Sequence, residues 1–109
     1  MHVEVFLSYA REDSDLAKQI IAKLEDDEIR VWWDEKITLD AEDFSFEIEE
    51  AIRAAQCFLV LWSGNSTKST WVKNEVDFAM KSKRKLVQVC VGDIQVPLGF
   101  GRGLCKQLY

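Results

Sequence analysis

The chain has 109 residues, of which 48% are hydrophobic and 30% are charged, and this balance is typical of one globular domain with a single core. The net charge is −5, with acidic and basic residues interleaved. Broad binding to nucleic acid or to an anionic membrane surface is therefore not expected, because both need a basic patch. No apolar run is long enough to cross a membrane and the first residues do not resemble a secretory signal, so a cytoplasmic location is expected.

The first half of the chain alternates between strand-like and helix-like segments. Val3–Ser8 is a short β-rich run, and it precedes a helix that Asp13 or Ser14 can cap and that extends to about Asp27. Arg30–Trp33 predicts a second strand. After a polar connection, a second helix is expected to turn one apolar face inward, formed by Phe44, Ile48, Ala51, Ile52 and Ala55.

The second half continues this alternation. Cys57–Trp62 is an unbroken apolar run, as expected for a central strand that is covered on both faces. A helix over Ser69–Ser82 follows, then a fourth strand at Leu86–Val91 and the start of a fifth within Lys106–Tyr109. Strands and helices alternating at this spacing predict an α/β fold, a doubly wound sheet of about five parallel strands flanked by helices.

The helix over Ser69–Ser82 carries a carboxylate within its apolar stripe. Glu75 follows Trp71 at i, i+4, so the two residues share one face of the helix. Burial of an unpaired carboxylate costs several kcal/mol, on the order of the desolvation penalty of a charge. Glu75 is therefore either paired or at the edge of the stripe, or it has a function.

Ligands of open α/β sheets bind beyond the carboxyl ends of the strands. Three predicted strands end there in polar or aromatic residues, at Ser8-Tyr9-Ala10-Arg11, Trp33-Asp34-Glu35 and Trp62-Ser63. Trp32 and Trp33 are adjacent in a strand and face opposite sides, so at least one of them is expected to serve packing alone. The first turn, SYAREDS, has neither GxGxxG nor GK[ST], which disfavours a Rossmann dehydrogenase or a P-loop NTPase.

Cysteines and histidine exclude several other site classes. Cys57, Cys90 and Cys105 are odd in number, and two of them lie in apolar runs, so we expect buried thiols in a reducing compartment. His2 is the one histidine, and no cysteine pair has ligand spacing, so a zinc site is not expected. A Ser or Cys nucleophile activated by a histidine base is also not expected, because His2 lies at the terminus.

Four segments resemble the Toll/interleukin-1 receptor (TIR) domain family, in its bacterial type. They are VFLSYARED, RVWWDEKI, IEEAIRAAQCFLVLWS and STWVKNE, which occur in family order over roughly Val3 to Pro97. The resemblance implies a flavodoxin-like fold for a single TIR domain over residues 1–109. If Tyr109 closes the fifth strand, the last helix, which would cover that edge, is missing, so we expect either that the chain is excised from a longer protein or that another domain covers the edge. It also implies cleavage of nicotinamide from NAD+, the reaction of an NAD+ nucleosidase.

The resemblance assigns roles to particular residues. The family's essential acid is the glutamate of a Trp-x-x-x-Glu stretch, which here is Glu75, four residues after Trp71. NAD+ is then the substrate, and no cofactor or metal is implied. The family also implies that a pocket for NAD+ is lined by Trp71, Tyr9, Ala10, Arg11, Trp33, Asp34, Phe44 and Ser69. One departure is Asp40-Ala41, where the family usually has Pro-Gly in the loop that mediates contacts between domains.

Three functions remain open from the sequence. The first is an NAD+-cleaving effector that is activated by self-association through TIR–TIR contacts and by a fused sensor domain, for example in bacterial anti-phage defence. The second is a non-catalytic TIR–TIR interaction module. The third is an enzyme similar to nucleoside deoxyribosyltransferases, which the STWVKNE and WWDEK segments disfavour.

Overall fold

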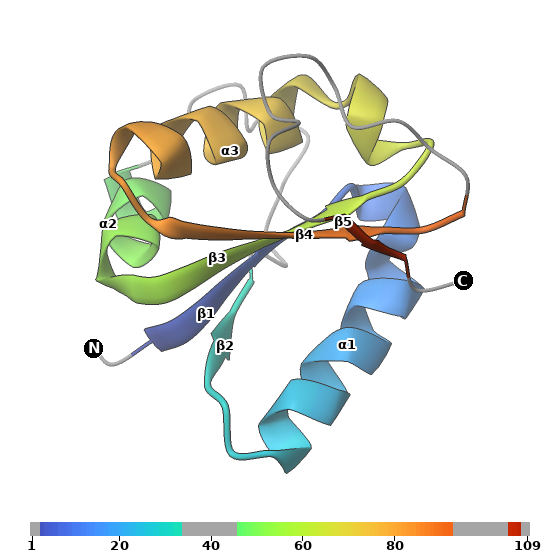
Figure 1. The fold of residues 1–109 in the computed structure, drawn as a ribbon, viewed down its shortest axis with the longest axis horizontal. Coiled ribbons are helices and arrows are strands. Elements are labelled where there is room, and N and C mark those ends of the chain that lie inside the picture. Colours follow the sequence, from blue (N-terminus) through green and yellow to red (C-terminus); the bar gives the residue numbers. More distant parts are fainter. Residues whose placement is uncertain (1–2, 34–45, 93–104, 108–109) are drawn as a thin grey trace.

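The computed structural model describes residues 3–33, 46–92 and 105–107, and these residues form one parallel sheet of five strands (Figure 1). The strands are β1 (Val3–Ser8), β2 (Val31–Trp32), β3 (Ala55–Trp62), β4 (Lys85–Cys90) and β5 (Cys105–Gln107). Their order is β2-β1-β3-β4-β5, and every neighbouring pair is parallel. The prediction of a doubly wound, flavodoxin-like sheet of about five parallel strands is confirmed.

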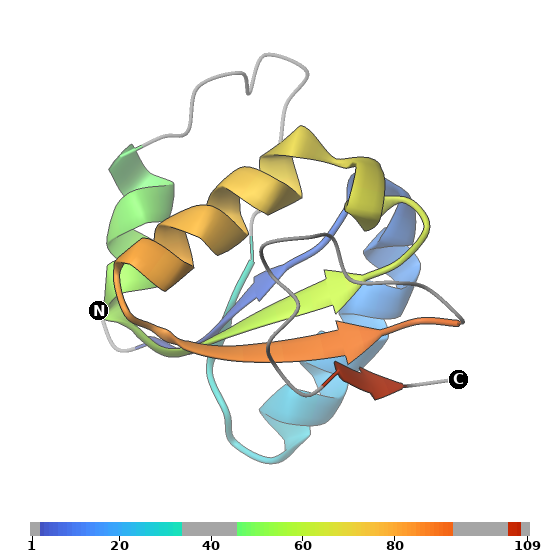
Figure 2. The same ribbon diagram turned by 45° about the horizontal axis from the view of Figure 1, so that its top comes forward.

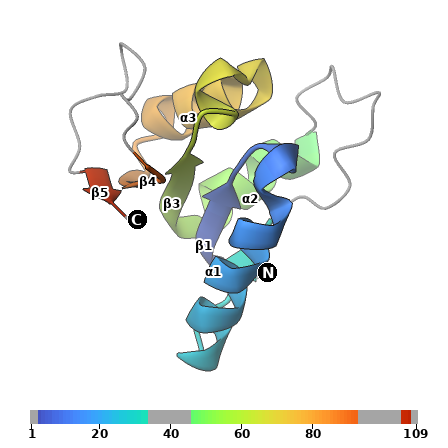
Figure 3. The ribbon, with the colours of Figure 1, turned by 90° about the vertical axis from the view of Figure 1, so that its right-hand side faces the viewer.

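Helices cover the two faces of this sheet. Figure 2 shows α2 (Phe46–Ala54) and α3 (Thr70–Lys81) together on one face, and Figure 3 shows α1 (Ser14–Asp26) on the other. Two short 3-10 helices, η1 (Arg11–Asp13) and η2 (Ser66–Lys68), follow β1 and β3. Within the described ranges, no helix combines the length and the apolar character that a membrane span requires.

Some element boundaries differ from those that the sequence predicted. β2 contains two residues rather than the stretch from Arg30 to Trp33, and the Arg30 carbonyl instead accepts hydrogen bonds from the backbone N–H groups of Glu4 and Val5. Ala55 begins β3, where it pairs with β1, rather than ending the preceding helix. A small apolar residue such as alanine is compatible with both the helical and the strand pattern of hydrophobic residues. Pairing with β1 therefore decides that Ala55 belongs to a strand.

The core has one layer on each face of the sheet. Side chains alternate along β1, so Phe6 packs under α2 and α3, whereas Leu7 packs against α1. The first layer is the larger and contains Phe6, Ile48, Ala51, Ile52, Ala55, Phe58, Val60, Trp62, Val72, Val76, Ala79 and Cys90. The predicted opposite orientation of Trp32 and Trp33 is confirmed, since Trp32 packs on the first layer and Trp33 on the second.

Three aromatic rings form a row across the first layer. Phe6 is in register with Trp32 on β2 and with Phe58 on β3. Its ring lies 4.9 Å from the Trp32 ring and 5.3 Å from the Phe58 ring, centroid to centroid, and both pairs are nearly parallel. Cross-strand aromatic pairs contribute stabilising free energy in addition to that of the apolar area they bury. This row therefore stabilises the association of β2, β1 and β3.

A buried polar pair lies farther along the same face. The Trp62 indole N–H donates to the Gln88 side-chain oxygen at 2.9 Å, and both side chains are fully buried. Gln88 is in register with Val60 on β3, and Val60 is in register with Ser8 on β1. The pair therefore connects β3 to β4 on the side of β3 away from β1.

The prediction that all three cysteines are buried thiols is wrong. Cys90, at the end of β4, is disulfide-bonded. Cys57 is free but only partly buried. Burial raises the pKa of the Cys57 thiol, and the charge of Lys85 on the paired strand opposes this shift.

Both long helices end in the same motif, with a non-glycine residue in the left-handed region. After α1, Glu28 has φ 63°, and Glu28 and Ile29 donate backbone hydrogen bonds to Glu25 and Leu24. After α3, Lys83 has φ 58° and makes the equivalent bond to Met80. This is the Schellman pattern, in which glycine is preferred.

Glycine at these two positions is expected to stabilise the fold. Glu28→Gly and Lys83→Gly should each raise the free energy of unfolding by about 0.5–1 kcal/mol, because relief of the left-handed strain outweighs the entropy that glycine adds to the unfolded chain. Urea denaturation measures the change. Lys18→Gly, at an exposed position in the middle of α1, is the control and should instead destabilise by about 1 kcal/mol. If Glu28→Gly and Lys83→Gly both lowered the free energy of unfolding, these two positions would not be strained by their left-handed backbone.

Candidate functional site

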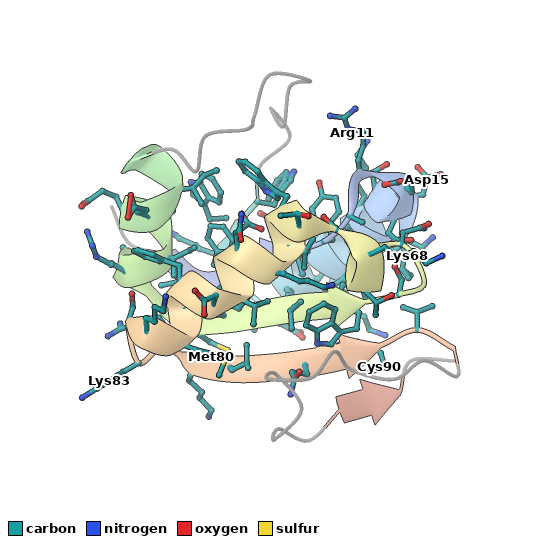
Figure 4. All side chains as sticks on the ribbon, turned by 90° about the horizontal axis from the view of Figure 1, so that it is seen from above. Arg11, Asp15, Lys68, Met80, Lys83 and Cys90 are labelled. Carbon is teal, nitrogen blue, oxygen red and sulfur yellow. The ribbon has the colours of Figure 1, made fainter. Side chains whose placement is uncertain are left out.

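The carboxyl edge of the sheet brings together the turns that follow β1 and β3. β1 ends at Ser8 and β3 ends at Trp62, and because the strands are parallel both chain ends leave at the same edge. η1 then leads into α1, while η2 leads into α3. Figure 4 shows Arg11 projecting from this edge, at the opposite end of the molecule from Lys83.

A pocket of about 250 Å³ opens at this edge. The described residues that line it are Tyr9, Ala10, Arg11, Glu12, Ser69 and Trp71. The first four follow β1 and the last two begin α3, so the pocket lies between the two turns. Five of these residues are among those that the family resemblance assigned to NAD+ binding. Glu12 is an addition, and its place within SYAREDS, directly after Arg11, was the available signal.

The start of α3 positions Trp71. Ser69 is the N-cap residue of this helix, and its side-chain oxygen accepts a hydrogen bond from the Val72 backbone N–H at 3.2 Å. Capping fixes where the first turn begins. Trp71 then falls in that turn, partly buried, with contacts to both the pocket and the core.

Glu75 is buried one turn farther along α3. Its exposed fraction is 2% and that of Ser8 is 1%. The Ser8 hydroxyl donates a hydrogen bond to Glu75 Oε1 at 2.6 Å. The helix pattern left three alternatives open, namely a paired carboxylate, one at the edge of the stripe and one with a function. The structure shows a paired carboxylate, and pairing is compatible with a function. Glu75 is not among the residues that line the pocket, although Ser8 precedes Tyr9 and Trp71 shares its helix face.

Asp13 occupies the N-cap position of α1, one of the two positions predicted, but its side chain makes no capping hydrogen bond. Its carboxylate instead accepts hydrogen bonds from the Ser63 hydroxyl and, at 3.0 Å, from the Asn65 amide. Ser63 in turn accepts bonds at 3.1 Å from the backbone N–H groups of Asn65 and Ser66. This hydrogen-bond network connects the turn after β1 to the turn after β3 and so stabilises their relative positions at the carboxyl edge. Ser63 and Asp13 are 50 positions apart, beyond the reach of a local pattern.

Three other predicted residues are not placed at the pocket. Trp33 packs against the core layer under α1 and is absent from the described lining, so its assignment to the pocket rests on the resemblance alone. Asp34 and Phe44 lie outside the described residues, as does the Asp40-Ala41 departure. Among the residues that the structure does describe, no group of three or more His, Cys, Asp or Glu side chains could hold a metal ion.

The sequence matches the family model for the TIR domain over residues 5–107. The chain belongs to the TIR domain family. No curated protein matches this TIR domain. The match to the family covers β1 through β5 and includes both turns of the pocket.

Solved TIR structures share this fold. A metazoan TIR-STING receptor from C. gigas, in complex with 2′,3′-cGAMP, has a TM-score of 0.78 at 25% identity, over 98% of this chain and 35% of that one. The TIR domains of the activated Roq1 resistosome, which directly recognises the pathogen effector XopQ, have a TM-score of 0.68 at 25% identity, over 83% of this chain and 58% of theirs. The TIR domain of the Toll-related receptor TRR-2 from Hydra magnipapillata has a TM-score of 0.76 at 17% identity, over 95% and 82%. This chain therefore spans little more than half of the Roq1 TIR chain and about a third of the TIR-STING chain.

Proposed function

We propose that this TIR domain is an NAD+ nucleosidase that cleaves the bond between nicotinamide and ribose, with Glu75 as its essential acid. The observation that carries the proposal is Glu75 itself, a buried carboxylate on the same helix face as the pocket-lining Trp71. NAD+ is the substrate, and the reaction needs no cofactor. The products are nicotinamide and either ADP-ribose or a cyclic ADP-ribose isomer.

The chemistry fits a site with one acid. When the C–N bond breaks, both bonding electrons leave with the nicotinamide, which departs neutral and needs no proton from an acid. The ribose is left as an oxocarbenium-like cation, and a nearby carboxylate stabilises such a cation electrostatically. In hydrolysis, water then attacks the anomeric carbon and loses one proton, which gives ADP-ribose.

The burial of Glu75 supports control by self-association. NAD+ held in the pocket of the single copy does not touch a carboxylate that is 2% exposed and outside the pocket lining. Access to Glu75 therefore requires residues packed over it to move, and we infer that Trp71, one helical turn before it, is among them. We propose that contact between TIR domains drives this movement, so that an isolated copy has little activity. The wider role that we propose is that of a cytoplasmic effector in bacterial anti-phage defence, coupled to a fused sensor domain.

A second candidate function is a non-catalytic TIR–TIR interaction module. The observation that favours it is the short hydrogen bond from Ser8 to a carboxylate that the pocket does not reach. In such a module Glu75 would serve only as a buried structural acceptor. The two functions differ in whether assembled protein releases nicotinamide.

The test follows nicotinamide release from NAD+ by chromatography, with dilute protein and with protein concentrated under crowding or on a multivalent scaffold. We expect release by the assembled protein and a turnover per copy that increases with concentration. No release by protein whose assembly is verified by light scattering would contradict NAD+ cleavage and favour the interaction module. Equal turnover per copy at all concentrations would contradict control by assembly alone.

A further inference from the structure

Ser8 occupies a position where the fold would otherwise place an apolar side chain. It is the last residue of β1, two positions after Phe6, and it faces α3 on the same side of the sheet. Its register partner on β3 is the fully buried Val60. A hydroxyl at a site that is 1% exposed is costly unless it has a hydrogen-bond partner, so a serine here requires an acceptor nearby.

The acceptor is the carboxylate of Glu75, 67 positions away in the sequence. The separation of 2.6 Å between Ser8 Oγ and Glu75 Oε1 is in the range of charge-assisted bonds between a hydroxyl and a carboxylate. Such a bond fixes the rotation of the carboxylate about its last side-chain bond. β1 thus supplies the hydrogen-bond donor that holds the Glu75 carboxylate of α3.

We propose that Ser8 is a positioning residue for NAD+ cleavage. Its hydrogen bond to Oε1 of Glu75 keeps the carboxylate in a fixed direction when the residues packed over Glu75 move. This inference rests on the proposed function. Ser8 does not line the pocket, so it acts through Glu75 and not by contact with substrate. Its contribution therefore lies in the chemical step, not in the binding of NAD+.

The experiment compares steady-state nicotinamide release by assembled wild type, Ser8→Ala, Ser8→Cys and Ser8→Thr. Alanine removes the donor, cysteine keeps a similar shape with a weak donor, and threonine keeps the hydroxyl. We expect kcat to fall about 10–100-fold in the alanine and cysteine variants, with KM within about twofold of wild type because binding groups are unchanged. Threonine should restore kcat to within several-fold of wild type. If the alanine variant does not fold, the cysteine and threonine pair carries the comparison.

Gln88→Leu is the matched control for a buried polar side chain. It removes the acceptor of the Trp62 indole on the same face of the sheet, but Val60 separates it from Ser8. This variant should lose stability and keep wild-type kcat. The proposal is overturned if Ser8→Ala and Ser8→Cys both turn over at the wild-type rate, if Ser8→Thr is as impaired as Ser8→Ala, or if Gln88→Leu loses kcat equally. In each of these results wild type is active and NAD+ cleavage stands, whereas inactivity of assembled wild type contradicts both proposals.

Discussion

Glu75→Gln is expected to lower nicotinamide release by assembled protein about 10²–10³-fold, the loss that follows removal of one preorganised electrostatic group from an active site. Glutamine retains the shape of the side chain and an oxygen that can accept the Ser8 hydrogen bond, but it has no charge with which to stabilise the ribose cation. The measurement is steady-state release of nicotinamide under assembling conditions. Circular dichroism and light scattering verify that the variant folds and associates as wild type does.

The control for this change is Asp77→Asn. Asp77 lies on the same helix, two residues later, and removal of its charge alters the net charge by the same amount. Its side chain is 52% exposed and pairs with Lys81 across one helical turn, an interaction that contributes about 0.3–0.5 kcal/mol. Asp77→Asn should retain full turnover. Equal release by wild type and a folded, assembled Glu75→Gln protein would show that the buried carboxylate is structural.

Phe6→Ala is expected to have the largest effect on stability, about 3–5 kcal/mol, as is typical when a buried phenylalanine is truncated to alanine. Phe6 is fully buried and is the central ring of the row that joins Trp32 to Phe58. The substitution therefore leaves a cavity and removes both stacked pairs. A domain of this size has a total stability of about 5–15 kcal/mol, so the variant should unfold at a much lower urea concentration.

Two further variants grade this effect. Phe6→Leu fills most of the space and should cost less than Phe6→Ala, with loss of the ring stacking as the main remaining term. Gln56→Ala, at an exposed position of β3, should change stability by no more than about 0.5 kcal/mol. If Phe6→Ala cost no more than Gln56→Ala, the aromatic row would not be part of the stabilising core.

Much of the fold follows from the sequence because its signals are local. The unbroken apolar run ending at Trp62 indicated a central strand, and the period-two rule placed Trp32 and Trp33 on opposite faces. The helical stripe around Glu75 likewise indicated an acid on the core face of α3, one turn after Trp71. Each of these inferences depends on residues within a few positions of one another. The regular geometry of the helix and strand backbone is therefore enough to predict which face each of these residues occupies.

The site depended on contacts that no local pattern describes. Asp13 has the residue type and position of a helix cap, yet Ser63 and Asn65 from the turn after β3 bind its carboxylate instead. The sequence pattern predicts only that Ser8 ends a strand, whereas its bond to Glu75 forms because β1 and α3 pack together. Local residue patterns are sufficient to predict the order of strands and helices along the chain, the parallel sheet and the face of α3 on which Glu75 lies. Only the packing of β1 against α3 shows that this carboxylate is buried and bonded to Ser8. The cost of burying a polar group is offset here by a donor that folding brings from 67 positions away.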